Sequence, residues 1–148
     1  MRRTNRTAYT KRERTMRIGA HVSTAKSADL AIDRALEIGA EAVQVFVSPP
    51  QQWSFNPVDE RIATNFKLKS REHDIGPNII HAIYLVSLGS DDDALVNRGK
   101  NSLKKYMNAA SDIGALGVVF HLGSHKGKGF EAVFDQVASH SKDVLSES

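Results

Sequence analysis

Three of the six histidines in the sequence stand where a predicted strand ends. They are His21, His81 and His121, and each follows a short apolar run. In parallel α/β sheets and barrels, the carboxyl ends of the strands form the face where ligand-binding side chains gather. Imidazole is the commonest neutral metal ligand, so three of them at equivalent positions predict a metal or phosphoryl site. For any one alone, the alternative is a core histidine bonded to a backbone carbonyl.

Further candidate residues lie in loops that are expected to leave the same face. The segment 49–53 (PPQQW) follows the second predicted strand, and Tyr84 follows the third. An exposed Trp or Tyr in a stiff loop can act as a stacking wedge for DNA bases. The alternative for Trp53 is ordinary packing at the rim of the fold. His125, just beyond His121, is either a supporting partner of the site or simply exposed.

These residues need a scaffold in which short strands alternate with helices. The apolar periodicity predicts strands at 17–21, 42–47, 78–81 and 117–121, and helices at 25–38, 57–73, 94–113 and 130–145. Four βα units in strict order imply right-handed crossovers and a parallel sheet. Two α/β architectures fit: a doubly wound sheet, or the first four βα units of a (βα)8 TIM barrel. No G-x-G-x-x-G follows the first strand, as a dinucleotide-binding doubly wound fold would require.

Composition narrows the chemistry. With 41% hydrophobic and 25% charged residues, the 148-residue chain has the composition of a soluble globular domain. No apolar run approaches the roughly 18 residues that a membrane span needs. The sequence contains no cysteine, which excludes disulfides and thiolate metal sites and makes the reducing cytoplasm the natural compartment. Any metal must therefore be held by histidines and carboxylates.

The net charge of +3 is unevenly distributed. Residues 1–16 carry six basic residues against the single acid Glu13, whereas the remainder carries 14 basic and 16 acidic residues. We predict that residues 1–15 form a basic, disordered tail and that 16–148 form the folded domain. Such a tail can touch phosphates, but it is also what an upstream start codon before Met16 would produce. Net charge alone is therefore no argument for nucleic-acid binding.

Four segments together resemble the N-terminal half of the endonuclease IV family. They are IGAHVS at 18–23, QQW at 51–53, HAIYLVSLGS at 81–90 and FHLGSH at 120–125. This family comprises the type 2 apurinic/apyrimidinic endonucleases of DNA repair, also called deoxyribonuclease IV. The resemblance implies the first half of a (βα)8 TIM barrel and a cluster of three zinc ions at its C-terminal face. It also implies hydrolysis of the phosphodiester 5′ to an abasic site in double-stranded DNA.

The resemblance assigns roles to individual positions. His81 and His121 match two histidines that bind one zinc ion, and Tyr84 matches a tyrosine that enters DNA at the lesion. Gln52 and Trp53 match the loop that probes the minor groove.

Four positions carry weaker or altered roles. His21 matches a histidine that lies at the site without binding zinc, and we expect His21 and His125 to support the site. Gln51 stands where some members carry an inserting arginine, so this loop lacks a cation that would enter the DNA. Ser87 replaces the asparagine of the family signature H-x-x-Y-x-x-N-x-G and can replace only some of its hydrogen bonds.

The remaining zinc ligands of the family come from later strands, including a metal-bridging glutamate. Two imidazoles make an incomplete site, because even a catalytic zinc ion ordinarily has three protein ligands. We therefore expect an incomplete barrel that is catalytically inert unless it meets its missing C-terminal half or self-associates. Two alternatives remain: a sugar isomerase or epimerase barrel, which would not explain the QQW loop, and a non-catalytic half-barrel fragment.

Overall fold

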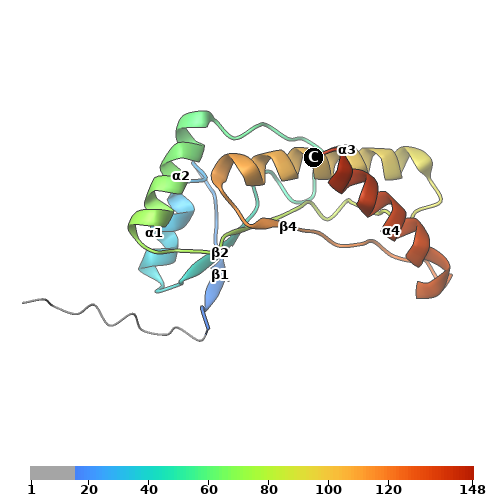
Figure 1. Cartoon of the computed structure of the whole chain (residues 1–148), viewed down its shortest axis with the longest axis horizontal. Coiled ribbons are helices and arrows are strands. Elements are labelled where there is room, and N and C mark those ends of the chain that lie inside the picture. Colours follow the sequence, from blue (N-terminus) through green and yellow to red (C-terminus); the bar gives the residue numbers. More distant parts are fainter. Residues whose placement is uncertain (1–15) are drawn as a thin grey trace, which may run out of the picture.

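The computed structural model of the chain describes residues 16–148, so the predicted tail at 1–15 lies outside the described residues. In the described part, strands and helices alternate (Figure 1). The elements are β1 (Gly19–His21), α1 (Leu30–Glu37), β2 (Ala42–Val45), α2 (Glu60–Glu72), β3 (Ile79–His81), α3 (Asp93–Ile113), β4 (Gly117–Val119) and α4 (Phe130–Ser146). This order confirms the predicted succession of βα units.

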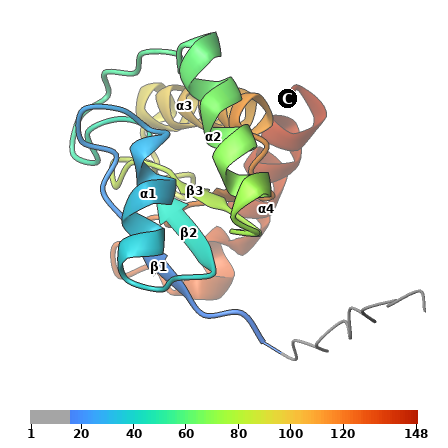
Figure 2. The same cartoon turned by 90° about the vertical axis from the view of Figure 1, so that its left-hand side faces the viewer.

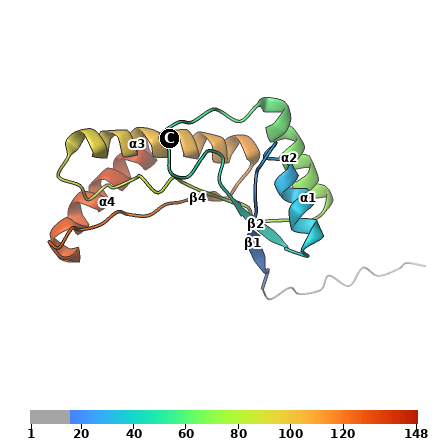
Figure 3. The ribbon, with the colours of Figure 1, turned by 180° about the vertical axis from the view of Figure 1, so that it is seen from behind.

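The four strands form one parallel sheet in the order β1-β2-β3-β4. Right-handed crossovers between sequential parallel strands place every helix on the same face of the sheet. In agreement, α1 packs on α2, α2 on α3, and α3 on α4, as Figures 2 and 3 show from two sides. A doubly wound sheet reverses its strand order at a switch point. The sequential order found here is instead that of consecutive barrel units.

The core lies between the sheet and the row of helices. Its fully buried apolar side chains come from the strands, the loops that follow them and the helices, and they include Ile32, Val45, Phe66, Ile80, Ile83 and Ile113. The central strands β2 and β3 are covered on both edges by neighbouring strands. None of the helices in residues 16–148 combines the length and hydropathy needed to cross a bilayer.

The first helix begins later than the apolar pattern predicts. Helix α1 starts at Leu30 rather than near residue 25. The Arg34 guanidinium donates to the backbone carbonyls of Ser23 (2.7 Å) and Ala25 (2.9 Å), which holds this segment outside the helix. Lys26 has a positive φ of 74°, which an α-helix does not allow. These contacts join residues 9–11 positions apart, so the apolar periodicity of the sequence could not predict them.

The other helices end close to their predicted positions. The Asp92 carboxylate accepts hydrogen bonds from the first N–H groups of α3, and this helix ends at Gly114 with a left-handed φ of 68°. A glycine just past the last apolar position is the usual helix terminator. The predicted end of this helix at residue 113 is therefore confirmed.

Strand β4 is shorter than predicted. It ends at Val119, so His121 lies two residues beyond the strand rather than at its last position. Only β3 pairs with β4 in the described part of the chain, and Val119 and Leu122 are 43% and 48% exposed.

Candidate metal centre at the strand ends

Five aromatic rings meet at the carboxyl ends of the four strands. The ring of His81 lies 5.2 Å from that of His121, 5.0 Å from that of Phe46 and 6.2 Å from that of His21, measured between centroids. The Tyr84 ring lies 5.6 Å from the rings of Phe46, His81 and His121. Three predicted histidines and the predicted tyrosine therefore share one cluster.

Phe46 is the member of this cluster that the sequence argument missed. It follows β2 directly, and its ring stands 4.6 Å from that of His21. Each of the four strands thus delivers an aromatic side chain at or just after its carboxyl end. The signal that could have identified Phe46 is its position at the end of a strand, equivalent to those of the histidines. However, Phe46 lies within an apolar run, which is equally typical of an ordinary buried strand.

His81 is held in a defined orientation. The side chain is buried, and its Nδ1–H donates to the backbone carbonyl of Ala82 at 2.6 Å. This bond fixes the tautomer and leaves the Nε2 lone pair free.

The spacing between His81 and His121 suits a shared ion. With zinc–nitrogen bonds of about 2.0–2.1 Å and tetrahedral angles, two imidazole rings on one ion have centroids about 5 Å apart. The observed separation is 5.2 Å with the ring planes tilted by 50°, so the two rings are close enough to share one ion. Within residues 16–148, however, no three His, Cys, Asp or Glu side chains are grouped as a metal site requires. The described residues therefore offer a partial site.

His21 has different surroundings from His81. The Gln44 amide nitrogen lies 3.0 Å from Nδ1 of His21 and donates to it, which places the ring proton of the neutral imidazole on Nε2. Burial against its neighbours, and then repulsion from His81, lowers the pKa of the His21 imidazole. In its neutral form, His21 therefore carries an Nε2–H that can donate a hydrogen bond.

The loop after β3 is tied to the loop after β2. The backbone N–H of Tyr84 donates to the carbonyl of Pro50 at 2.8 Å. This bond joins the cluster to the segment 49–53, while the Tyr84 ring stays 48% exposed. The exposed ring borders the two histidines and is open to a ligand arriving from solvent.

The segment 51–53 divides into two parts. Gln51 and Gln52 are exposed. Trp53 is half-buried and packs against the core, and the guanidinium carbon of Arg98 lies 4.6 Å from the centroid of its ring. These contacts favour the rim-packing interpretation of Trp53 and leave the two glutamines as the accessible part of the loop.

The glycine-rich loop after β4 is organised by His125. Its Nδ1 accepts hydrogen bonds from the backbone N–H groups of Gly127 and Gly129, both at 3.2 Å. Gly123 lies so close to Ser87 that an added Cβ would stand 2.4 Å from the serine Oγ. His125 therefore shapes its own loop. The loop after β3 and the loop after β4 meet at the contact between Ser87 and Gly123.

Comparison with known proteins places this chain in a family. Residues 32–147 match the model of the xylose isomerase-like TIM barrel family. A protein of Haloquadratum walsbyi described as probable endonuclease 4 is 37% identical over 124 residues, covering 84% of this chain and 45% of the relative. One from Halothermothrix orenii with the same description is 33% identical, covering 89% and 48%. The chain spans about half the length of these curated relatives.

Solved structures also match this chain over about half of their own length. The crystal structure of endonuclease IV from Thermus thermophilus matches with a TM-score of 0.79 and 27% identity, covering 88% of this chain and 46% of that one. A D-psicose 3-epimerase from Clostridium cellulolyticum matches with a TM-score of 0.65 at 10% identity. The second likeness shows the shared fold alone.

Proposed function

The chain belongs to the xylose isomerase-like TIM barrel family, in its endonuclease IV branch, and we propose that it forms half of a zinc-dependent DNA repair endonuclease. In this proposal the complete enzyme cleaves the phosphodiester 5′ to an abasic site. The observation that carries it is the His81–His121 pair, with ring centroids 5.2 Å apart. The absence of cysteine from the sequence supports a cytoplasmic location.

His81 and His121 would hold one zinc ion of the three-ion cluster. The hydrogen bond from Nδ1 of His81 to the Ala82 carbonyl supports this role, because it aims the free Nε2 and raises its basicity. When bound, zinc supplies a water of lowered pKa and neutralises charge on the leaving oxygen. The Nε2–H of His21 supports the separate role of a hydrogen-bond donor at the edge of the site.

The exposed aromatic and amide residues would recognise the lesion. An abasic nucleotide has lost its stacking base, so extruding it costs less than flipping a normal nucleotide. The half-exposed Tyr84 ring, held by the Pro50 carbonyl, would fill the vacated space. Gln51 and Gln52 would reach the minor groove. Phe46 lies between His21, His81 and Tyr84 and would exclude water from beneath them.

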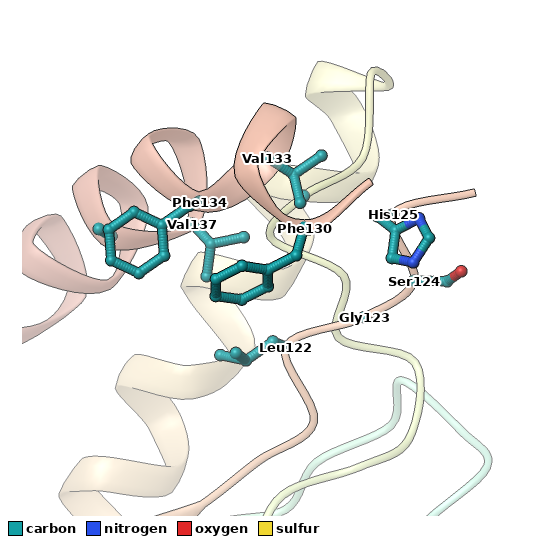
Figure 4. A pocket seen from close by; sticks show the side chains of 10 residues that line it. Leu122, Gly123, Ser124, His125, Phe130, Val133, Phe134 and Val137 are labelled. Atoms are coloured by element: carbon teal, nitrogen blue, oxygen red, sulfur yellow. The ribbon is translucent and has the colours of Figure 1, made fainter. Parts of the chain in front are cut away.

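The open edge of the half barrel supports the need for a complement. Figure 4 shows an apolar hollow between α4 and the loop that follows β4. Leu122, Phe130 and Phe134 line it and are 48%, 57% and 50% exposed. Exposed apolar surface of this kind favours association. We propose that the missing C-terminal barrel half, or a second copy of the chain, covers this surface and adds the further ligands. Alone, the chain is then expected to be catalytically inert.

Zinc binding tests the metal assignment. Titration of the full chain with zinc chloride should show one ion bound, with affinity reduced at least about tenfold in both His81→Ala and His121→Ala. His73→Ala is the matched control, because His73 is an exposed histidine at the end of α2. Equal binding by all three variants would exclude the strand-end pair as the site.

Binding and incision of an abasic duplex test the DNA assignment. The chain should bind an abasic duplex more tightly than the intact one, and Tyr84→Ala should remove this preference. Neither duplex should be cut by the chain alone. Chelator-sensitive incision by the chain alone would overturn the expected inertness, and equal affinity for both duplexes would overturn lesion recognition. Isomerisation of a free ketose in place of both would favour the sugar isomerase alternative.

A further inference from the structure

A hollow of 480 Å³ opens between Trp53 and the exposed side of α3. It shares no lining residue with the five-ring cluster. Apart from Trp53 and one alanine, every side chain that lines it can donate a hydrogen bond, and no carboxylate lines it. The donors are Asn97, Arg98, Asn101, Ser102 and Lys105.

The basic residues of α3 fall into two groups. Lys100 and Lys104 form ion pairs with Asp143 and Glu147 of α4. Arg98 and Lys105 line the hollow instead, and neither forms an ion pair with another residue of the described part, 16–148. Two cations without carboxylate partners, beside two amides, create a site of positive potential that favours an anion.

The wall of the hollow is pre-organised. Arg98 stacks on Trp53 with 4.6 Å between the guanidinium carbon and the ring centroid, which orients the planar guanidinium. The loop that carries Trp53 is fastened at both ends to Tyr106 of α3. The Ser48 and Tyr106 hydroxyls are hydrogen-bonded, and the Phe55 and Tyr106 rings meet edge to face at 5.2 Å. Binding therefore costs little ordering of this wall.

We propose that this hollow binds a backbone phosphate of duplex DNA, with Arg98 and Lys105 as its charged contacts. This proposal rests on the proposed DNA-directed function and adds a phosphate contact outside the metal centre. The same loop links the two places, because Pro50 accepts the Tyr84 N–H at one end and Trp53 forms the hollow at the other. Phosphate contacts of this kind fix the register of a protein on DNA without reading its sequence.

The sole tryptophan of the sequence lies in the hollow and provides a local probe. Emission of Trp53 in the full chain is followed during titration with a lesion-free duplex, at about 50 mM salt and at higher salt. Anisotropy of a labelled duplex gives total binding in parallel. Binding at the hollow should change Trp53 emission with the same midpoint as the anisotropy.

Two variants and one matched control separate the hollow from other basic surfaces. Lys105→Ala should weaken duplex binding about three- to tenfold and reduce the salt slope by about 1. Arg98→Lys keeps the charge but loses the planar fork, and should weaken binding by a smaller factor. Lys142→Ala removes one exposed lysine of α4. It should change the duplex affinity by less than about twofold and leave the salt slope unchanged.

The outcomes are distinct. A Trp53 response that depends on Lys105 but not on Lys142 supports the phosphate site. Duplex binding with an unchanged Trp53 emission, or equal effects of Lys105→Ala and Lys142→Ala, would overturn the site and leave the proposed function standing. A Lys105-dependent response without zinc binding or abasic preference would overturn the proposed function alone. Absence of any duplex binding at low salt would overturn both.

Discussion

The centre of the sheet and its β4 edge are built from similar residues in different surroundings. In register with one another, Ile80 of β3 is fully buried, whereas Val118 of β4 is only partly buried. The same contrast separates Phe66 of α2, fully buried, from Phe134 of α4, 50% exposed. The side chains at the centre are therefore fully buried, whereas apolar side chains at the β4 edge remain partly exposed.

The two proposed zinc ligands fall on opposite sides of this division. His81 comes from the centre, is buried, and is oriented by the Ala82 carbonyl. His121 comes from the edge and is exposed, two residues after its strand has ended. His81 is therefore pre-organised by its packing and its hydrogen bond, whereas the exposed position of His121 leaves its ring less constrained.

The largest expected difference is in stability. Phe66→Ala should lower the free energy of unfolding by about 3–5 kcal/mol, because it leaves a cavity in the core. Phe134→Ala should cost about 1 kcal/mol or less, since its ring is half exposed. Urea unfolding followed by circular dichroism measures both. If Phe66→Ala does not fold, the matched pair Phe66→Leu and Phe134→Leu still tests the contrast, and the cost should be larger at position 66. Similar costs at both positions would contradict it.

A smaller effect is expected where the β4 loop meets the centre. Gly123 has a φ of +94°, and an added Cβ would stand 2.8 Å from Cα of Ser87. Gly123→Ala should therefore destabilise by about 2–3 kcal/mol through strain and overpacking. Gly127 has a φ of +84° but open space around it, so Gly127→Ala should cost only about 1 kcal/mol. The difference between their unfolding midpoints isolates the contact with Ser87, and equal midpoints would mean that the loop is free to move away.

Association should respond to the edge alone. Phe134→Glu places a charge beside the hollow of Figure 4 and should prevent any self-association of the chain while leaving the centre folded. Glu72→Gln on the exposed end of α2 is a control that changes charge elsewhere. Sedimentation velocity at several concentrations compares the two. Unchanged self-association in Phe134→Glu would place the contact surface elsewhere.

The smallest effect concerns acid stability. Burial raises the pKa of Asp29, but hydrogen bonds from the Ser27 hydroxyl and Lys69 outweigh it, and the net pKa lies below its ordinary value. The pKa of Asp143 on α4 is lowered by its hydrogen bond from Lys100. A carboxyl whose pKa is lower in the folded state stabilises the fold above its unfolded pKa. This stability is lost as pH falls through the folded-state pKa.

Asp29→Asn and Asp143→Asn measure this contrast between the buried and exposed carboxyls. Asp29→Asn should flatten the fall in stability between about pH 5 and pH 2 more than Asp143→Asn does, because Asp143 is exposed and screened by solvent. Urea unfolding across this range gives the slopes. Equal flattening by the two variants would show that solvent screening does not weaken the contribution of Asp143 relative to that of Asp29.

The local pattern of the chain predicted most of the scaffold, and the reasons for its errors are specific. Short apolar runs and helical apolar spacing located every strand and helix of the described part, and α3 ends at the predicted residue 113. The start of α1 was wrong because Arg34 binds carbonyls 9 and 11 residues away. Phe46 was missed because a ring at a strand end looks like a ring inside a buried strand.

The amino-acid sequence by itself determined the succession of βα units and the types of side chain at the strand ends. These features follow from local periodicity and from the fixed direction of parallel strands. Only the tertiary structure decided which of those side chains meet, that His81 keeps Nε2 free, and that Arg98 lies over Trp53, 45 positions away. Contacts between distant positions depend on how helices and strands pack, and periodicity carries no information about them.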